Sequence, residues 1–217
     1  MTQLAAIFDM DGVLVDTYRA HYRSWVAMAE KEGFTFTEEQ FAGAFGRTSR
    51  EIIAHFWGEG LSDRRIAEMD AEKEAAFRTL IEDEFPAMPG AGKLIDDLAD
   101  DGFALAVGSS GPPENVHMVL DRLGVRDRFQ ATVTGSDVTR GKPDPQVFLL
   151  AGQRLGIAPR RCAVVEDAPA GVAAARAAGM KSIGLASTGR TPDDLREADL
   201  VVVQLDELTP ERIRSMF

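Results

Sequence analysis

The sequence has 217 residues, of which 45% are hydrophobic, and its formal net charge is −11. A chain of this length forms one large domain or a domain with an inserted subdomain. The negative charge argues against nucleic acid and against an anionic membrane surface as partners, because both require a basic face. No apolar run approaches the roughly 20 residues that span a bilayer. We also expect the protein to be a monomer.

The single cysteine, Cys162, excludes an intrachain disulfide, which is typical of a reducing compartment. Cys162 opens the apolar run Cys162–Val165, so a buried structural thiol is favoured over a nucleophile. The first residues contain neither a basic region nor a cleavage site, so the sequence predicts no signal peptide. We therefore expect a cytoplasmic protein.

The first predicted element is a buried strand over Leu4–Phe8, which is apolar throughout and leads directly into Asp9, Met10, Asp11 and Gly12. Carboxylates beside a core are strongly disfavoured unless a metal or a substrate compensates their charge. Clustered carboxylate oxygens are ligands that suit Mg²⁺. The alternative is an ordinary turn at Asp11 and Gly12, with Asp9 acting only as a cap.

The next segment, residues 18–85, is helical in pattern and poor in strands. Apolar residues recur along it at the spacing of amphipathic helices. These residues include Trp25, Val26, Met28, Ala29, Ile52, Ile53, Phe56, Trp57, Ile66, Met69, Phe77, Leu80 and Ile81. The segment ends at Met88, Pro89 and Gly90, which break the chain.

After this break, strands and helices alternate along the chain. The predicted strands are 104–107, 131–133, 163–165, 182–185 and 200–203. The predicted helices are 91–101, 114–123, 145–155 and 170–178. Repeated strand–helix units with apolar strands predict an α/β fold, in which helices cover both faces of a parallel sheet.

The first strand is expected to belong to this sheet, which makes the helical segment an insertion. We therefore predict a core domain from residues 1–16 and 86–217 and a small helical cap domain from residues 17–85. In open parallel sheets, ligands bind at the carboxyl ends of the strands. Each unusual polar cluster of the chain follows a predicted strand, as expected for an active site at that edge.

Two of these clusters carry groups that suit a phosphate. Ser109 and Ser110 follow a predicted strand and precede a helix, where hydroxyl and amide groups can hold an anion. Lys142 precedes two prolines, Pro143 and Pro145, at the start of another helix and could neutralise carboxylates or phosphate. The alternatives are a helix cap for the serines and a solvated surface position for the lysine.

A further cluster repeats the pattern of the first strand, because Glu166 and Asp167 follow the apolar residues Val164 and Val165. If both strands lie in one sheet, their acids meet at one edge and require a divalent cation. The alternative is an acid pair that interacts with the dipole of the next helix. That alternative explains one acidic pair but not both.

Together these segments resemble the haloacid dehalogenase superfamily of phosphotransferases over essentially the whole chain. The four motifs follow one another in the order known from that family. They are Asp9–Asp16, Ser109, Lys142 within Gly-Lys-Pro-Asp-Pro, and Glu166–Asp167. The resemblance implies a Rossmann-like core with an inserted helical cap and a Mg²⁺-dependent phosphotransferase activity.

The resemblance also implies roles for the residues of these motifs. Asp9 resembles the nucleophile that accepts the phosphoryl group, and Asp11 resembles the general acid and base. The implied metal ligands are Asp9, Asp11 through its backbone carbonyl, Glu166 and Asp167. The implied phosphate-binding residues are Ser109, Ser110 and Lys142.

The start of the helical segment is similar to the cap entry of β-phosphoglucomutases and related sugar phosphatases. The resemblance implies that His21, Arg50 and Lys73 of the cap contact the substrate. Basic groups above an acidic metal site suit a small anionic metabolite. The alternatives are a core histidine at the hinge and solvated charges on helix faces.

Within the superfamily, three functions remain open at this point. The first is a Mg²⁺-dependent phosphatase of small phosphorylated metabolites, in particular sugar phosphates. The second is a β-phosphoglucomutase, although Gly111–Asn115 lacks the Lys-Asn pair that is typical of those enzymes. The third is a non-catalytic protein that binds a phosphorylated ligand, which the presence of all four motifs disfavours.

Overall fold

The computed structural model describes residues 3–44, 47–83, 85–187 and 189–217. At its centre lies a six-stranded sheet with the order β3-β2-β1-β4-β5-β6, in which all neighbouring strands are parallel. The strands are β1 (Ala5–Phe8), β2 (Ala104–Gly108), β3 (Ala131–Val133), β4 (Cys162–Glu166), β5 (Lys181–Leu185) and β6 (Leu200–Val202). The predicted parallel sheet is confirmed, and the observed ends of each strand lie within one residue of the predicted ones.

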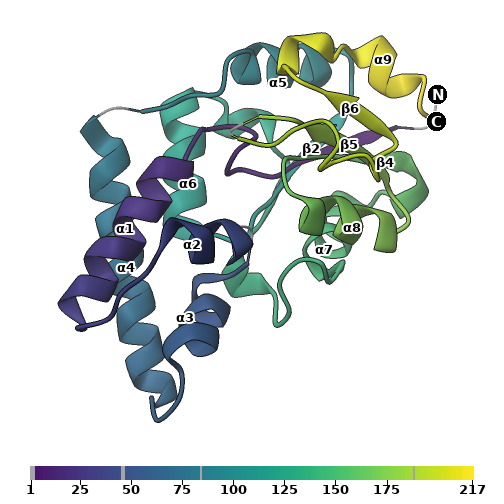
Figure 1. The fold of residues 1–217 in the computed structure, drawn as a ribbon. Coiled ribbons are helices and arrows are strands. Elements are labelled where there is room, and N and C mark those ends of the chain that lie inside the picture. Colours follow the sequence, from purple (N-terminus) through teal and green to yellow (C-terminus); the bar gives the residue numbers. More distant parts are fainter. Residues whose placement is uncertain (1–2, 45–46, 84, 188) are drawn as a thin grey trace.

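Helices cover both faces of the sheet, as Figure 1 shows. One face carries α5 (Ala91–Asp100), α6 (Pro113–Leu123) and α9 (Pro210–Arg214), and the other carries α7 (Gln146–Leu155) and α8 (Pro169–Ala177). Side chains alternate between the two faces of a strand. In β1, Ala6 and Phe8 therefore pack into the first layer, while Ala5 and Ile7 pack into the second.

Short 3₁₀ helices complete the connections between these elements. They span Arg126–Arg128, Gly135–Asp137, Pro159–Arg161 and Leu205–Glu207. The terminal helix α9 was not among the predicted elements. It buries Ile213 against the first layer of the core.

The described residues between β1 and α5 form four helices, which we call the cap helices. They are α1 (Tyr18–Lys31), α2 (Glu38–Ala44), α3 (Ser49–Trp57) and α4 (Asp63–Asp83). They have an apolar core of their own, built around residues such as Trp25, Phe41, Ile53 and Met69. Figure 1 shows them grouped beside the sheet.

Two adjacent backbone segments join the cap helices to the sheet. The amide of Asp16 donates to the carbonyl of Pro86 at 2.8 Å, and the amide of Met88 donates to the carbonyl of Leu14 at 2.9 Å. The chain therefore leaves the sheet and returns to it side by side. This arrangement favours the division into a core and a cap, whose boundaries stay a prediction.

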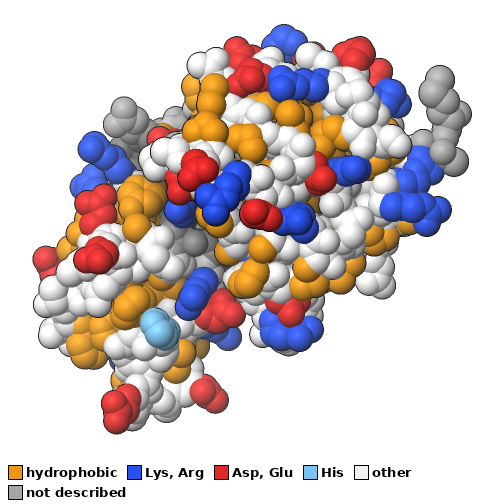
Figure 2. Space-filling model, turned by 45° about the vertical axis from the view of Figure 1, so that its right-hand side comes forward, with side chains coloured by type: hydrophobic (Ala, Val, Ile, Leu, Met, Phe, Trp, Pro, Cys, Tyr) orange, Lys and Arg blue, Asp and Glu red, His pale blue; other side chains and the backbone are white. Residues whose placement is uncertain are grey.

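Acidic and basic side chains are interspersed over the face shown in Figure 2. In the described part of the chain, no helix combines the length and the apolar character needed to cross a membrane.

Candidate active site

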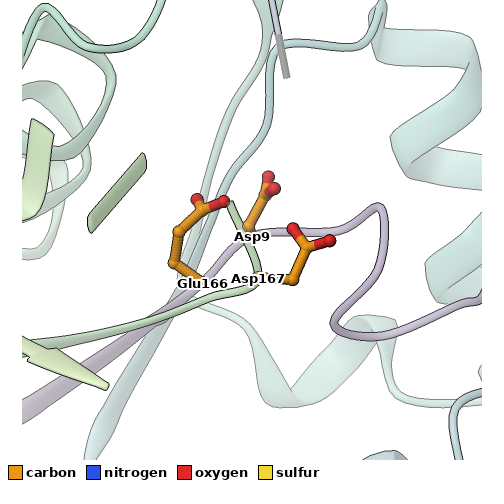
Figure 3. A group of neighbouring side chains, drawn as sticks. All are labelled: Asp9, Glu166 and Asp167. Atoms are coloured by element: carbon orange, nitrogen blue, oxygen red, sulfur yellow. The ribbon is translucent and has the colours of Figure 1, made fainter. Parts of the chain in front are cut away.

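Three carboxyl groups meet at the carboxyl edge of the sheet because β1 and β4 are neighbours in register. Phe8 lies opposite Val165, and the amide of Asp9 donates to the carbonyl of Val165 at 2.9 Å. Glu166 ends β4 and Asp167 follows it. One oxygen from each of Asp9, Glu166 and Asp167 lies within 4.8 Å of the others. Figure 3 shows the three side chains rising from the strand ends into one shared space.

Lys142 balances part of this negative charge. Its Nζ lies 2.9 Å from Oδ1 of Asp9 and donates to Oε2 of Glu166 at 2.7 Å. The side chain is 1% exposed, so it is not the solvated lysine of the alternative interpretation. Burial alone would lower the pKa of Lys142, but Asp9 and Glu166 raise it above its usual value. Lys142 is therefore a fixed positive charge beside the first aspartate.

One lysine does not neutralise three buried carboxylates. Burial, together with the charge of Glu166, raises the pKa of Asp9 to about 8 despite the opposing effect of Lys142. Burial and the same neighbour raise the pKa of Asp167 well above its usual value. Among the described side chains, no group forms a hydrogen bond with the buried Oδ2 of Asp167. The protein alone therefore leaves this cluster short of positive charge.

These observations fit a divalent cation. Clustered oxygen ligands, one of them buried and without a partner among the described residues, are the donor set that Mg²⁺ takes. Gly12 keeps the space in front of Asp167 open, because a Cβ at this position would lie 2.1 Å from Oδ2. The cluster of Asp9, Glu166 and Asp167 can therefore hold a metal ion.

Asp11 is turned away from this cluster and toward α1. Its Oδ1 accepts a hydrogen bond from Oγ1 of Thr17 at 2.6 Å and lies 3.0 Å from Nε2 of His21. Burial alone would raise the pKa of Asp11, but His21 and Thr17 lower it. Its carboxylate is not one of the three clustered groups. The predicted metal contact through its backbone carbonyl stays a prediction.

A chain of polar contacts continues from Asp11 into the cap helices. Nζ of Lys73 lies 2.7 Å from Nδ1 of His21, whose ring stacks on Phe77. Because an ammonium group only donates, Nδ1 accepts this bond and Nε2 carries the hydrogen that faces Asp11. Lys73 also donates to Oε1 of Glu74 at 2.8 Å. The orientation of Asp11 thus depends on α1 and α4.

The two serines after β2 occupy different environments. Ser109 is fully buried, and its Oγ accepts a hydrogen bond from the amide of Gly111 at 3.0 Å. Ser110 lines a pocket together with Asp9 and Asp11. Of the two predicted phosphate-binding serines, Ser110 is the one that lines this pocket, and phosphate binding by each of them stays a prediction.

This pocket lies between the sheet edge and the cap helices. The core side contributes Asp9, Asp11, Ser110, Gly111 and Asp167. The cap side contributes His21, Trp25, Phe41, Arg47, Ser49, Ile52, Lys73 and Glu74. The pocket is thus lined on one side by Asp9 and Asp167 of the carboxylate cluster and on the other side by side chains of the cap.

A family comparison agrees with this arrangement. The model of the haloacid dehalogenase-like hydrolases matches residues 4–179, which include both acidic pairs and Lys142. The chain belongs to the haloacid dehalogenase-like hydrolases. The predicted family and its Rossmann-like α/β fold are confirmed.

The names of similar proteins in this hydrolase family refer to enzymes of phosphorylated sugars and related compounds. β-Phosphoglucomutase of Bacillus subtilis is 34% identical over 97% of this chain and 94% of its own length. Hexitol phosphatase A of Escherichia coli is 37% identical over 94% of this chain and 92% of its own length. These relatives support a phosphotransferase, as predicted.

Solved structures show the same architecture. β-Phosphoglucomutase from Clostridium difficile superposes with a TM-score of 0.89 at 28% identity, covering 99% of this chain and 96% of that one. CbbY from Rhodobacter sphaeroides, solved with xylulose-(1,5)bisphosphate, gives 0.85 at 27% identity over 95% and 96% of the two chains. Both crystallised proteins exceed 25% identity with this chain over nearly their full length.

In this hydrolase, the predicted cap residues divide into two groups. His21 and Lys73 line the pocket with Asp9. Nε of Arg50 instead lies 3.1 Å from Oδ2 of Asp70, and Arg50 borders a neighbouring groove. Substrate contact by each of these residues stays a prediction. For Arg50, the ion pair with Asp70 competes with such a contact.

Two charged residues that line the pocket, Arg47 and Glu74, were not among the predicted site residues. Arg47 stands three residues before Arg50 in the same basic segment, so that segment was the available signal. Glu74 follows Lys73 on a charge-rich helix, where nothing in the pattern separates a buried acid from a solvated one. Burial alone would raise the pKa of Glu74, but Lys73 and His21 lower it to about 2.

Proposed function

We propose that this chain is a Mg²⁺-dependent phosphatase that hydrolyses monophosphate esters of small sugars or polyols through an aspartyl-phosphate on Asp9. The observation that carries the proposal is the contact between Asp9 and buried Lys142 beside Asp167, whose Oδ2 has no described partner. Asp9, Asp167 and Glu166 would hold Mg²⁺, which neutralises the charge of the phosphoryl group when bound. The cytoplasmic location and the monomeric state expected from the sequence belong to this proposal.

In the first step, a carboxylate oxygen of Asp9 attacks phosphorus and the bond to the ester oxygen breaks. Asp11 in its protonated form gives its proton to the leaving oxygen, which departs as the sugar hydroxyl. Lys142 holds Asp9 from one side and provides positive charge next to the phosphoryl group. Ser110, which lines the same pocket as Asp9, would donate a hydrogen bond to the transferred group.

In the second step, water attacks the phosphorus of the aspartyl-phosphate. The Asp11 carboxylate takes the proton of this water, and the bond between phosphorus and Asp9 breaks to release inorganic phosphate. The lowered pKa of Asp11 in the protein without substrate favours the carboxylate form that this step requires, whereas the first step requires that the negative charge of the bound phosphate raise this pKa. Thr17 and His21 hold the carboxylate in place for both proton transfers.

The substrate class is proposed from the relatives. Besides hexitol phosphatase A, they include the fructose-1-phosphate phosphatase YqaB of Escherichia coli and a phosphorylated carbohydrates phosphatase of Thermotoga maritima. Their names share a phosphate ester on a hydroxylated carbon chain. We therefore choose fructose 1-phosphate and glucitol 6-phosphate as first substrates.

Release of inorganic phosphate from these two compounds tests the proposal. We expect Mg²⁺-dependent release that stops in EDTA, and we expect Asp9→Asn to lose at least about 10³-fold in kcat because the nucleophile is gone. Thermal unfolding of the variant serves as the control for folding. Retained activity in Asp9→Asn would contradict the role of Asp9, and absence of release from both compounds would contradict the substrate class.

A β-phosphoglucomutase is the second candidate, and the relative from Bacillus subtilis favours it. The two reactions differ in the acceptor, which is water in the phosphatase and a sugar hydroxyl in the mutase. Phosphorus NMR distinguishes them, with β-glucose 1-phosphate, Mg²⁺ and a trace of glucose 1,6-bisphosphate. We expect free phosphate, and a build-up of glucose 6-phosphate with little free phosphate would establish the mutase instead.

A further inference from the structure

The cap wall of the pocket carries a buried ion pair rather than an unbalanced positive charge. Nζ of Lys73 lies 2.8 Å from Oε1 of Glu74, and their side chains are 2% and 5% exposed. Both residues line the pocket that contains Asp9 and Asp11. The charge of Lys73, which the sequence predicted to face an anionic substrate, is therefore neutralised inside the wall.

Lys73 is also held by its other neighbours. Nζ lies 2.7 Å from Nδ1 of His21, and it sits 5.1 Å and 5.4 Å from the ring centroids of Trp25 and Phe77. These contacts hold Lys73 in place, and its ammonium group in turn positions the ring of His21. They leave it poorly suited to bind a second phosphate.

Glu74 retains the capacity for one more hydrogen bond. Its Oε1 accepts from Ser49 and Lys73, and its Oε2 accepts from Nδ2 of Asn115 at 2.6 Å. A carboxylate has about four acceptor positions, so one remains on Oε2. A hydroxyl group that reaches this position can donate to it, whereas an unprotonated phosphate oxygen cannot, because both oxygens are acceptors.

The other positively charged side chains near the pocket do not give the cap wall an unbalanced positive charge. Arg50 is paired with Asp70 and borders the neighbouring groove. Arg47 lines the pocket but is exposed, so solvent and salt screen its charge. Glu74 is 4% exposed, so its charge acts through a medium of lower effective dielectric constant than the charge of exposed Arg47 does.

We infer that Glu74 selects the distal end of the substrate in two ways: it accepts a hydrogen bond from a substrate hydroxyl, and it neutralises Lys73, so that the cap wall offers no unbalanced positive charge to a second phosphate. This inference rests on the proposed function, because it assumes that one phosphate ester lies at Asp9. The substrate class is then narrowed to monophosphates of polyhydroxylated chains. Bisphosphates, which a mutase requires as intermediates, are disfavoured in this pocket.

Fructose 1-phosphate and fructose 1,6-bisphosphate form the test pair, since they differ in the second phosphate. We expect the wild type to favour the monophosphate at least about tenfold in kcat/KM. We expect Glu74→Gln to reduce this ratio about tenfold, mainly by lowering KM for the bisphosphate. Glu74→Asp retains the charge and is expected to keep the ratio within about threefold.

Glu72→Gln is the matched control, because Glu72 lies on the same helix, pairs with Lys31 at the surface and changes the net charge equally. It is expected to leave the ratio unchanged. A wild type that accepts both compounds equally would overturn the inference without any variant. An equal shift in Glu72→Gln and Glu74→Gln would overturn it too.

Titration calorimetry with Mg²⁺ separates this inference from the proposed function. If no phosphate is released from either compound, the proposed function is wrong, and the two affinities still decide the role of Glu74. Tighter binding of the monophosphate to the wild type, lost in Glu74→Gln, would support the inference. Equal affinities of the wild type for both compounds would overturn it.

Discussion

Asp9 illustrates how single residues at the site depend on their surroundings. In water its carboxyl group would be an ordinary acid, but burial and Glu166 raise its pKa to about 8 even though Lys142 is 2.9 Å away. The neutral and ionised forms of the cluster are therefore close in free energy near neutral pH. A divalent cation shifts this balance toward the ionised form, because it binds carboxylates.

This balance predicts an unusual dependence of stability on pH. The carboxyl group of Asp9 has a pKa of about 8 in the folded protein and an ordinary value of 3.8, so between these pH values the folded state holds the additional proton. The free energy of unfolding of the metal-free protein should therefore fall as pH rises from about 4 to about 8.

Urea unfolding in EDTA at a series of pH values measures this slope. Asp9→Asn should make the slope flatter, since its amide does not titrate. Saturating Mg²⁺ should weaken the decrease, because metal binding favours the ionised carboxylates. A stability that rises with pH over the whole range in EDTA would contradict the assignment.

At the scale of elements, the loop after β1 shows how the backbone makes room for the site. Gly12 has a φ of +76°, a conformation that L-residues rarely adopt, and it faces Asp167. Gly33 has nearly the same φ of +75°, but among the described residues no heavy atom apart from its chain neighbours lies within 4 Å of its Cβ position. Both positions therefore require a residue that tolerates a positive φ. They differ because a side chain at Gly12 would also collide with Asp167, whereas one at Gly33 would not.

We predict that Gly12→Ala reduces both stability and metal binding. The left-handed backbone alone costs about 1–2 kcal/mol with a Cβ, and the clash with Asp167 adds to this cost. Thermal unfolding with and without Mg²⁺ measures both effects. Gly33→Ala is the matched control and should show the backbone cost with a normal stabilisation by Mg²⁺. Equal behaviour of the two variants would contradict the role of Gly12.

Much of the sheet could be predicted because its strands are short apolar runs with polar ends. The acids at the ends of β1 and β4 followed from the same pattern, since neighbouring parallel strands end at one edge. The partner of Arg50 could not be predicted, because Asp70 lies on a different helix. The burial of Glu74 depends on contacts with Ser49 and Asn115, which are distant in sequence. Local patterns carry no information about such contacts.

At the scale of the whole molecule, α6 of the core docks onto α4 of the cap helices through Asn115. This fully buried side chain donates to Oε2 of Glu74 at 2.6 Å and accepts from Arg78 at 3.0 Å. A second contact joins the amide of Gly141, next to Lys142, to Oε1 of Glu51 at 3.1 Å. These polar contacts join the cap helices to the core beside the active site.

We predict that Asn115→Ala weakens this docking. Both cap partners lose a hydrogen bond, which costs about 1–3 kcal/mol when the groups stay buried. Hydrogen exchange in α1 and α4 should become faster, while the exchange of β1 and β4 stays unchanged. His117→Ala, an exposed position of the same helix, is the control. Unchanged exchange in α4 of the Asn115 variant would contradict this role.

The measurement that tests the account most directly is the capture of the phosphorylated enzyme during turnover. The enzyme is quenched in acid with fructose 1-phosphate and Mg²⁺ present, reduced with borohydride, and examined by peptide mass spectrometry. We predict conversion of Asp9 to homoserine, which marks an acyl phosphate at that side chain. Modification at another residue, or steady release of phosphate with Asp9 unmodified, would contradict the proposed mechanism.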